Sequence, residues 1–372
     1  MVRSWVLALI SSIGISAVSM AHPADAPLHS DLKRAIEKEG AAFVQAGNTD
    51  GLSIAIVRDG HTEYFNFGTT VRGKVNLPNQ NTVYEIGSVT KTFTSLLLAH
   101  AIVEKKASAS DDIRHYLPGA FPNLQFQGTP VTLMDLVTTT SALPDNLPDF
   151  MVLLKTVGPD KAPQAIMAML QHYSAKALLD DLPNASLSSK PGTTPKHSNV
   201  APELLGLMLE KMYGQSYATL LSNYVEKPAG MQSGVAKDRL PEMASGYMTS
   251  ADAMPLISTV DFILPAGGLR YSASDMAKYI ALQLDTSNPA IALTHRVAWG
   301  DINQQAVGFD WKISKTDDGK TRLSHDGGTF GFSSFVDLYP DAHEGIVLLA
   351  NRSGPMTQDQ LRMLSDQIRK DF

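Results

Sequence analysis

The order of patterned segments along the 372-residue chain predicts an α/β protein of the α+β type, in which both chain ends complete a mainly antiparallel sheet flanked by helices. Three observations lead to this expectation. Short extended segments occur near the N-terminus, a long and mostly helical pattern occupies the middle, and extended segments return near the C-terminus. We therefore expect a helical lobe inserted beside the sheet, with a cleft between the two lobes.

The first 21 residues have the pattern of a secretory signal peptide. Arg3 supplies a positive charge, and an apolar stretch covers Trp5–Val18. Ser19 and Ala21 place small side chains where a signal peptidase inspects them, which predicts cleavage after Ala21. The alternative is a membrane anchor, but such a span needs about 20 apolar residues. We expect a periplasmic or secreted protein with no stable membrane span after cleavage, and one catalytic domain over 22–372.

Residues 22–87 are expected to supply the first part of the sheet lobe. Ser30 is placed to cap a helix. The apolar residues of this helix share one face: Leu32, Ile36, Phe43 and Val44. The alternating apolar residues of 52–56 predict a strand, and a second extended run covers Tyr64–Phe67. Asp59-Gly60 between them favours a tight hairpin turn, because both residues readily adopt positive φ.

The helical lobe is expected over 88–264, with a loop rich in Pro, Ser and Thr over 183–195. The sheet lobe then resumes over 265–372. Its extended segments are Thr321–Ser324, Phe332–Leu338 and Glu344–Ala350. A closing helix has Leu361, Leu364 and Ile368 on one face, and Thr357 with Gln360 predicts a capping box at its start.

Charge and composition exclude several classes of function. The net charge of -6 argues against a nucleic-acid partner and against adhesion to anionic lipid. The chain has no cysteine, which excludes disulfides, thiolate catalysis and Cys-ligated zinc. Its histidines are scattered and no His-Glu-x-x-His occurs, so we expect neither a metal nor another cofactor. The sequence leaves the oligomeric state open.

Ser88 and Lys91 are the strongest candidates for chemistry. Residues three apart on a helix share a face, so a neutral lysine there can take the proton of the serine hydroxyl. The spacing alone is weak, because Ser30 and Lys33 have it too. Gly87, which lets the chain turn before Ser88, distinguishes the pair Ser88 and Lys91 from the pair Ser30 and Lys33.

Two further motifs carry weaker signals. His197-Ser198-Asn199 combines a titratable ring with an amide, although a lone His-x-Asn is usually a surface loop. His325-Asp326-Gly327-Gly328 ends an extended segment. Its glycines would let a substrate backbone lie alongside the strand and would free an N–H as an oxyanion donor. A glycine-rich hairpin turn is the alternative interpretation.

Together the three motifs resemble the serine β-lactamases and penicillin-binding enzymes. The likeness is greatest to the branch of class C β-lactamases and D-alanyl-D-alanine carboxypeptidases/endopeptidases, to which family VIII esterases are also related. That family is marked by Ser-x-x-Lys, Tyr-x-Asn and Lys-or-His-x-Gly in this order. Other segments of this chain also resemble the family: Thr132–Leu136 with Thr140–Pro144, Ser198–Ala201, Pro265–Leu269 with Ser274–Met276, and Leu349–Ser353.

The resemblance implies a β-lactamase/transpeptidase-like fold and a role for each motif. Ser88 would be the acylated nucleophile and Lys91 its base. Asn199 would contact the substrate amide, and His325 and the two glycines would line the third side of the cleft. The backbone N–H groups of Ser88 and Gly328 would form the oxyanion hole.

Two positions depart from the family pattern. His197 stands where the family has tyrosine, and an imidazole can shuttle protons closer to neutral pH. Asp326 stands where a hydroxyl residue is common, and facing the cleft it would repel a substrate carboxylate. Because strands alternate their faces, Asp326 can also point away.

The expected reaction is acyl transfer to water through Ser88. The first choice of substrate is an amide or peptide of D-amino-acid or cell-wall type. An esterase on small acyl esters, a class C-like β-lactamase and a penicillin-binding protein without turnover are the alternatives. The expected partners are therefore small molecules or peptides.

Overall fold

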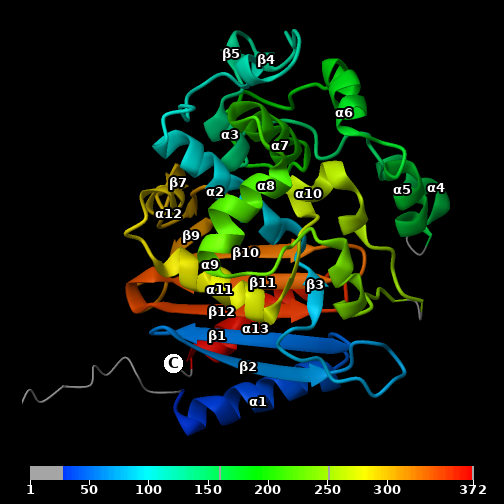
Figure 1. The fold of residues 1–372 in the computed structure, drawn as a ribbon, viewed down its shortest axis with the longest axis vertical. Coiled ribbons are helices and arrows are strands. Elements are labelled where there is room, and N and C mark those ends of the chain that lie inside the picture. The colour runs from blue at the N-terminus through cyan, green and yellow to red at the C-terminus, as the bar shows by residue number, and fades with distance from the viewer. Residues whose placement is uncertain (1–27, 159–160, 250–251, 371–372) are drawn as a thin grey trace, which may run out of the picture.

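An eight-stranded antiparallel sheet forms the centre of the computed structural model, which describes residues 28–158, 161–249 and 252–370 (Figure 1). The strand order is β2-β1-β12-β11-β10-β9-β8-β7, so both chain ends contribute to one sheet, as the sequence predicts. The strands are β1 Gly51–Arg58, β2 His61–Gly68, β7 Trp299–Asp301, β8 Gln305–Val307, β9 Lys312–Lys315, β10 Thr321–Gly328, β11 Ser333–Tyr339 and β12 Glu344–Ala350. The predicted signal peptide lies outside the described residues.

The predicted N-terminal hairpin is confirmed. β1 and β2 pair in register from Gly51 with Gly68 to Arg58 with His61, which leaves a two-residue turn. Both turn residues have positive φ, 48° at Asp59 and 82° at Gly60. This is the backbone conformation that the Asp-Gly pair was expected to supply.

The sheet is buried on both faces. Leu52, Ile54 and Ile56 of β1 pack with α1 (Ser30–Gln45) and α13 (Thr357–Lys370) in one core. Ala55 and Val57 face the other way, into the core shared with the helical lobe. Because successive side chains of β1 point to opposite faces, the terminal helices pack on one face of the sheet and the helical lobe packs on the other. Figure 1 shows α1 and α13 on one side of the sheet and α11 (Ala273–Leu284) with the helical lobe on the other.

The lobe over 88–264 is largely helical, as predicted, and its described residues include two very short strands, β4 Gln125–Phe126 and β5 Thr129–Pro130. Its α-helices are α2 Thr90–Val103, α3 Leu133–Val137, α4 Met151–Val157, α5 Ala162–Leu170, α6 Ala175–Asp181, α7 Val200–Tyr213, α8 Tyr217–Leu221, α9 Lys227–Ala229 and α10 Leu264–Gly267. A two-stranded sheet of β3 Val83–Glu85 and β6 Arg270–Ser272, followed by α11 and α12 (Pro289–Thr294), links this lobe to the main sheet. No helix among the described residues is both long and apolar enough to cross a bilayer.

The two predicted helix caps are wrong by one residue. Ser30 is the first residue of α1, and His29 caps it, because the N–H of Lys33 donates to the carbonyl of His29. Thr357 likewise lies inside the first turn of α13 and forms no capping box, since the N–H of Gln360 donates to the carbonyl of Met356. Cap identity depends on where the first i to i−4 bond closes, which a pattern of residue types locates only to within a residue or two.

Candidate active site

Ser88 lies in a short 3-10 turn, Gly87–Val89, that runs directly into α2. Phe93, Leu96 and Leu97 of this helix are buried in the main core, so the helix start is firmly anchored. The free N–H groups of a helix start carry a partial positive charge, which favours a developing alkoxide and disfavours an ammonium nearby.

A glycine at position 327 allows β10 to lie directly against this turn. A Cβ added to Gly327 would stand 2.1 Å from the carbonyl oxygen of Ile86 and 3.0 Å from the backbone nitrogen of Ser88. From the neighbouring strand β11, Ser334 Oγ donates a hydrogen bond of 2.7 Å to the same Ile86 carbonyl. Gly327 therefore serves close packing of backbone on backbone.

The turn itself also requires glycine. Gly87 has φ of 51°, and a Cβ there would stand 2.4 Å from the backbone nitrogen of Gly328. The backbone at Ser88 is thus held beside the backbone at Gly328. The N–H groups of these two residues therefore belong to adjoining segments, and their role as an oxyanion hole stays a prediction.

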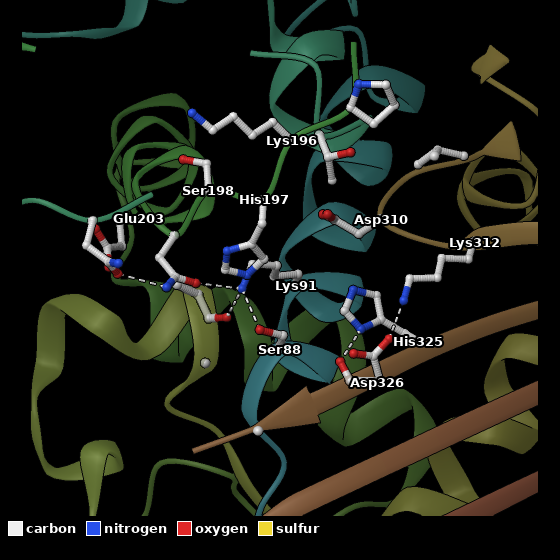
Figure 2. A pocket seen from close by; sticks show the side chains of 18 of the residues that line it. Ser88, Lys91, Lys196, His197, Ser198, Glu203, Asp310, Lys312, His325 and Asp326 are labelled. Carbon is white, nitrogen blue, oxygen red and sulfur yellow. Dashed lines mark hydrogen bonds and ion pairs between the residues drawn. The ribbon is translucent and has the colours of Figure 1, made fainter. Parts of the chain in front are cut away.

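The amino group of Lys91 is surrounded by three hydrogen-bond acceptors, and its side chain is 3% exposed. The acceptors are Ser88 Oγ at 2.8 Å, Asn199 Oδ1 at 2.9 Å and the carbonyl oxygen of Ala266 at 2.8 Å (Figure 2). An ammonium has three hydrogens to donate, so all of them are used. When the amine is neutral, its lone pair can face Ser88 and accept the hydroxyl proton.

Burial lowers the pKa of Lys91 to about 8, although the carboxylates around it act in the opposite direction. These carboxylates are Asp310, Glu203, Asp145 and Asp326. With that pKa, about one Lys91 in ten is neutral at pH 7, compared with fewer than one in a thousand for an ordinary lysine. The site therefore contains a usable base near neutral pH.

His197 and Asn199 enter the cleft from the loop that precedes α7. In Figure 2 the imidazole of His197 reaches toward Lys91 and Ser88, the residues with which it lines the cleft. Its Nδ1 lies 2.5 Å from Asp145 Oδ1. Asn199 Nδ2 donates to Asn146 Oδ1 at 2.9 Å, so the Asn199 amide is oriented at one end by Asn146 and at the other by Lys91.

His325 and Asp326 form the opposite wall, at the end of β10. His325 is buried, which lowers the pKa of its imidazole, and its Nδ1 donates to the backbone carbonyl of Asp326 at 2.7 Å. The Asp326 carboxylate lines the cleft and forms an ion pair with Lys312 of β9 (Figure 2). The sequence left the direction of Asp326 open; in the structure it lines the cleft with its charge compensated.

A cleft of about 750 Å³ brings the predicted site residues together. Those that line it are Ser88, Lys91, His197, Asn199, His325 and Gly328. Gly327 is the exception, because it lies behind the lining and packs on Ile86. Among the described residues, no group of three or more histidine, aspartate and glutamate side chains is arranged to hold a metal ion.

Several residues of the cleft carried no signal in the sequence. Burial raises the pKa of Glu203 well above its usual range and that of Asp310 to about 6, so two buried carboxyls flank Lys91. Lys312 and Asp145 complete the pairs with Asp326 and His197. Ala266 lies in the Pro-Ala-Gly-Gly-Leu segment noted above, which pointed to the family but not to this contact.

A family model described as Beta-lactamase matches residues 34–368. Protein flp of Staphylococcus aureus (strain N315) is 28% identical over 357 residues, covering 92% of this chain and 67% of the relative. A Beta-lactamase of Pseudomonas fluorescens is 24% identical over 366 residues, covering 88% of this chain and 95% of the relative.

Solved structures share the fold. A β-lactamase/D-alanine carboxypeptidase from Pseudomonas syringae superposes with a TM-score of 0.75 and 20% identity, covering 92% of this chain and 99% of the other. A class C β-lactamase gives a TM-score of 0.76 and 20% identity, covering 92% and 97%. These likenesses confirm the β-lactamase/transpeptidase-like fold that the sequence predicts.

Proposed function

The chain belongs to the β-lactamase family of acyl-enzyme serine hydrolases, and from this premise we propose that it is an exported hydrolase that cleaves an amide or peptide of D-amino-acid or cell-wall type through Ser88. One observation supports the assignment of Ser88 above all others. Lys91 Nζ lies 2.8 Å from Ser88 Oγ, buried and with its pKa lowered to about 8. A serine hydroxyl beside a partly neutral amine is an activated nucleophile.

The proposed reaction has two halves. Neutral Lys91 accepts the Ser88 proton while Oγ attacks the substrate carbonyl, and the backbone N–H groups of Ser88 and Gly328 stabilise the oxyanion. The leaving amine then takes a proton, from His197 in its protonated form or from Lys91, and departs. In the second half a water molecule loses its proton to whichever of these two residues protonated the amine, and it attacks the acyl-enzyme. Ser88 Oγ takes a proton back from the Lys91 ammonium as it leaves, which releases the acid and free Ser88.

The choice of an amide substrate is supported by the cleft and by the relatives. Asn199 presents its amide between Lys91 and Asn146, where it can hydrogen-bond a substrate amide. A volume of about 750 Å³ suits a short peptide. One structural neighbour is named a β-lactamase/D-alanine carboxypeptidase.

An esterase on small acyl esters is the second candidate, and the Lys312–Asp326 ion pair favours it. Peptides that end in a free carboxylate and β-lactams both place a negative charge near the scissile bond. At this wall Asp326 is negative, Lys312 offsets it, and burial keeps His325 neutral, so the three residues carry no net positive charge. A substrate carboxylate would therefore gain no electrostatic attraction at this wall, so a substrate without one would be at no disadvantage.

Intact-protein mass spectrometry over time distinguishes the candidates. The protein is mixed separately with a D-alanyl-D-alanine peptide, a p-nitrophenyl ester and a β-lactam. We expect a transient acyl adduct and released product with the peptide. Product from the ester alone would move the assignment to esterase, and rapid release of an opened β-lactam would move it to β-lactamase. A permanent β-lactam adduct without any turnover would indicate a penicillin-binding protein.

A matched pair of serine variants controls this experiment. Ser88→Ala should abolish adducts and product, because it removes the hydroxyl that lies beside Lys91. Ser30→Ala removes the other serine that precedes a lysine by three positions, and it should leave both unchanged. Loss of activity in the Ser30 variant, or retention in the Ser88 variant, would contradict the proposal.

A further inference from the structure

Four hydrogen bonds join the segment 144–146 to the motif 197–199. They are Ser198 Oγ to the Pro144 carbonyl at 2.6 Å, the Asn199 N–H to the Asp145 carbonyl at 2.8 Å, Asn199 Nδ2 to Asn146 Oδ1 at 2.9 Å, and the 2.5 Å contact of His197 Nδ1 with Asp145 Oδ1. Every residue of the motif is therefore held by at least one residue of the facing segment. The two loops form one unit although about 50 residues separate them.

The chemistry of the last contact fixes which atom carries the hydrogen. Burial alone would raise the pKa of Asp145, but the hydrogen bond and charge of His197 and the charge of Lys91 outweigh it and lower this pKa. Asp145 is thus a carboxylate and can only accept. The hydrogen must lie on Nδ1 of His197, and the neutral ring is left with its lone pair on Nε2.

We propose that Asp145 is a positioning residue that holds His197 with its hydrogen on Nδ1, so that Nε2 is the atom that exchanges protons in the cleft. This inference rests on the proposed function of His197 as the proton shuttle. In each half-reaction Nε2 would gain or lose one proton, while Asp145 stays ionised throughout. A tyrosine at position 197 would need no such partner, because its one hydroxyl oxygen both donates and accepts, whereas an imidazole divides these roles between two nitrogens.

The exposure of the pair sets the size of the effect. The side chains of His197 and Asp145 are 57% and 51% exposed, so solvent screens their charges and the contact acts mainly through geometry. Asp310 also interacts electrostatically with His197, and Lys91 and Lys196 share its cleft. Partners that orient a metal-binding imidazole typically contribute about 10–100-fold in activity, and we expect an effect of the same order here.

A double-mutant cycle tests whether Asp145 acts through His197. We expect Asp145→Asn to lower kcat/KM about 10–100-fold in the wild-type background, mostly in kcat, and less than about twofold in the His197→Ala background. Asp180→Asn is the matched control, because Asp180 is similarly exposed and pairs with Lys176 on α6, and it should change nothing. An equal loss in both backgrounds would overturn the proposal.

The tautomer can be observed without any substrate. In protein labelled with 15N-histidine, the nitrogen chemical shifts distinguish an Nδ1–H imidazole from an Nε2–H imidazole, and comparison with His197→Ala assigns the signal. We expect the Nδ1–H form in the wild type and a mixture in Asp145→Asn. A wild-type Nε2–H form would overturn the proposal. Because this readout needs no turnover, it separates failure of the positioning role from failure of the proposed function, which Ser88 labelling reports.

Discussion

Replacing Gly327 by alanine should damage the site more than its single added methyl group would indicate. The new Cβ would stand 2.1 Å from the carbonyl oxygen of Ile86 and 3.0 Å from the nitrogen of Ser88. Carbon and oxygen atoms approach to about 3.3 Å at closest, so β10 or the turn 86–88 must move by about 1 Å. That movement separates the backbone N–H groups of Ser88 and Gly328, which are proposed to bind the oxyanion.

The expected losses follow from this displacement. Misplacing catalytic groups by about 1 Å costs on the order of 100-fold in rate, which corresponds to about 2.7 kcal/mol of barrier. Overpacking should also lower the free energy of unfolding by about 1–3 kcal/mol. Hydrolysis kinetics and urea unfolding measure the two effects separately. Gly267→Ala is the matched control at a glycine that lines the adjoining cleft, because its added Cβ meets nothing closer than 3.7 Å. Wild-type kcat/KM and stability in the Gly327 variant would show that β10 and the turn 86–88 tolerate the added methyl group without moving.

Three further predictions concern protons and metals. Because Lys91 acts as a base only when neutral, kcat/KM should rise with pH through about 8; a profile that falls over this range would exclude Lys91 as the base. His197→Tyr should retain more activity than His197→Ala, since tyrosine is the family residue at this position, and equal rates with unchanged pH profiles would show that His197 only lines the cleft. Activity should survive EDTA, and a loss that added metal restores would indicate a metal-dependent enzyme.

Local rules explain the parts of the fold that the sequence predicts. The hairpin over 51–68 depends on alternation within one strand and on Asp59-Gly60, and both are visible in a short stretch of sequence. The pairing of Ser88 with Lys91 is equally local, because three residues of helix bring them to one face. Strands β7–β9 escaped detection because runs of three or four residues are too short to show alternation.

Contacts between distant segments explain what the sequence could not supply. The carbonyl of Ala266 reaches Lys91 across 175 positions, and a backbone acceptor leaves no trace in residue type. Asp145 meets His197 only because two loops are joined, and Lys312 meets Asp326 only through strand pairing. The sequence motifs identified the candidate reacting residues. The groups that orient these residues or balance their charge come from distant segments and depend on tertiary structure.

The role of Ser88 as the acylated residue is tested by mapping a covalent adduct to its position in the chain. The protein is quenched during turnover or after labelling with a slowly released acylating agent, digested, and sequenced by tandem mass spectrometry. We expect a single modified residue, Ser88, and no modification in Ser88→Ala. A stable adduct on any other residue, or full hydrolysis by Ser88→Ala, would contradict it.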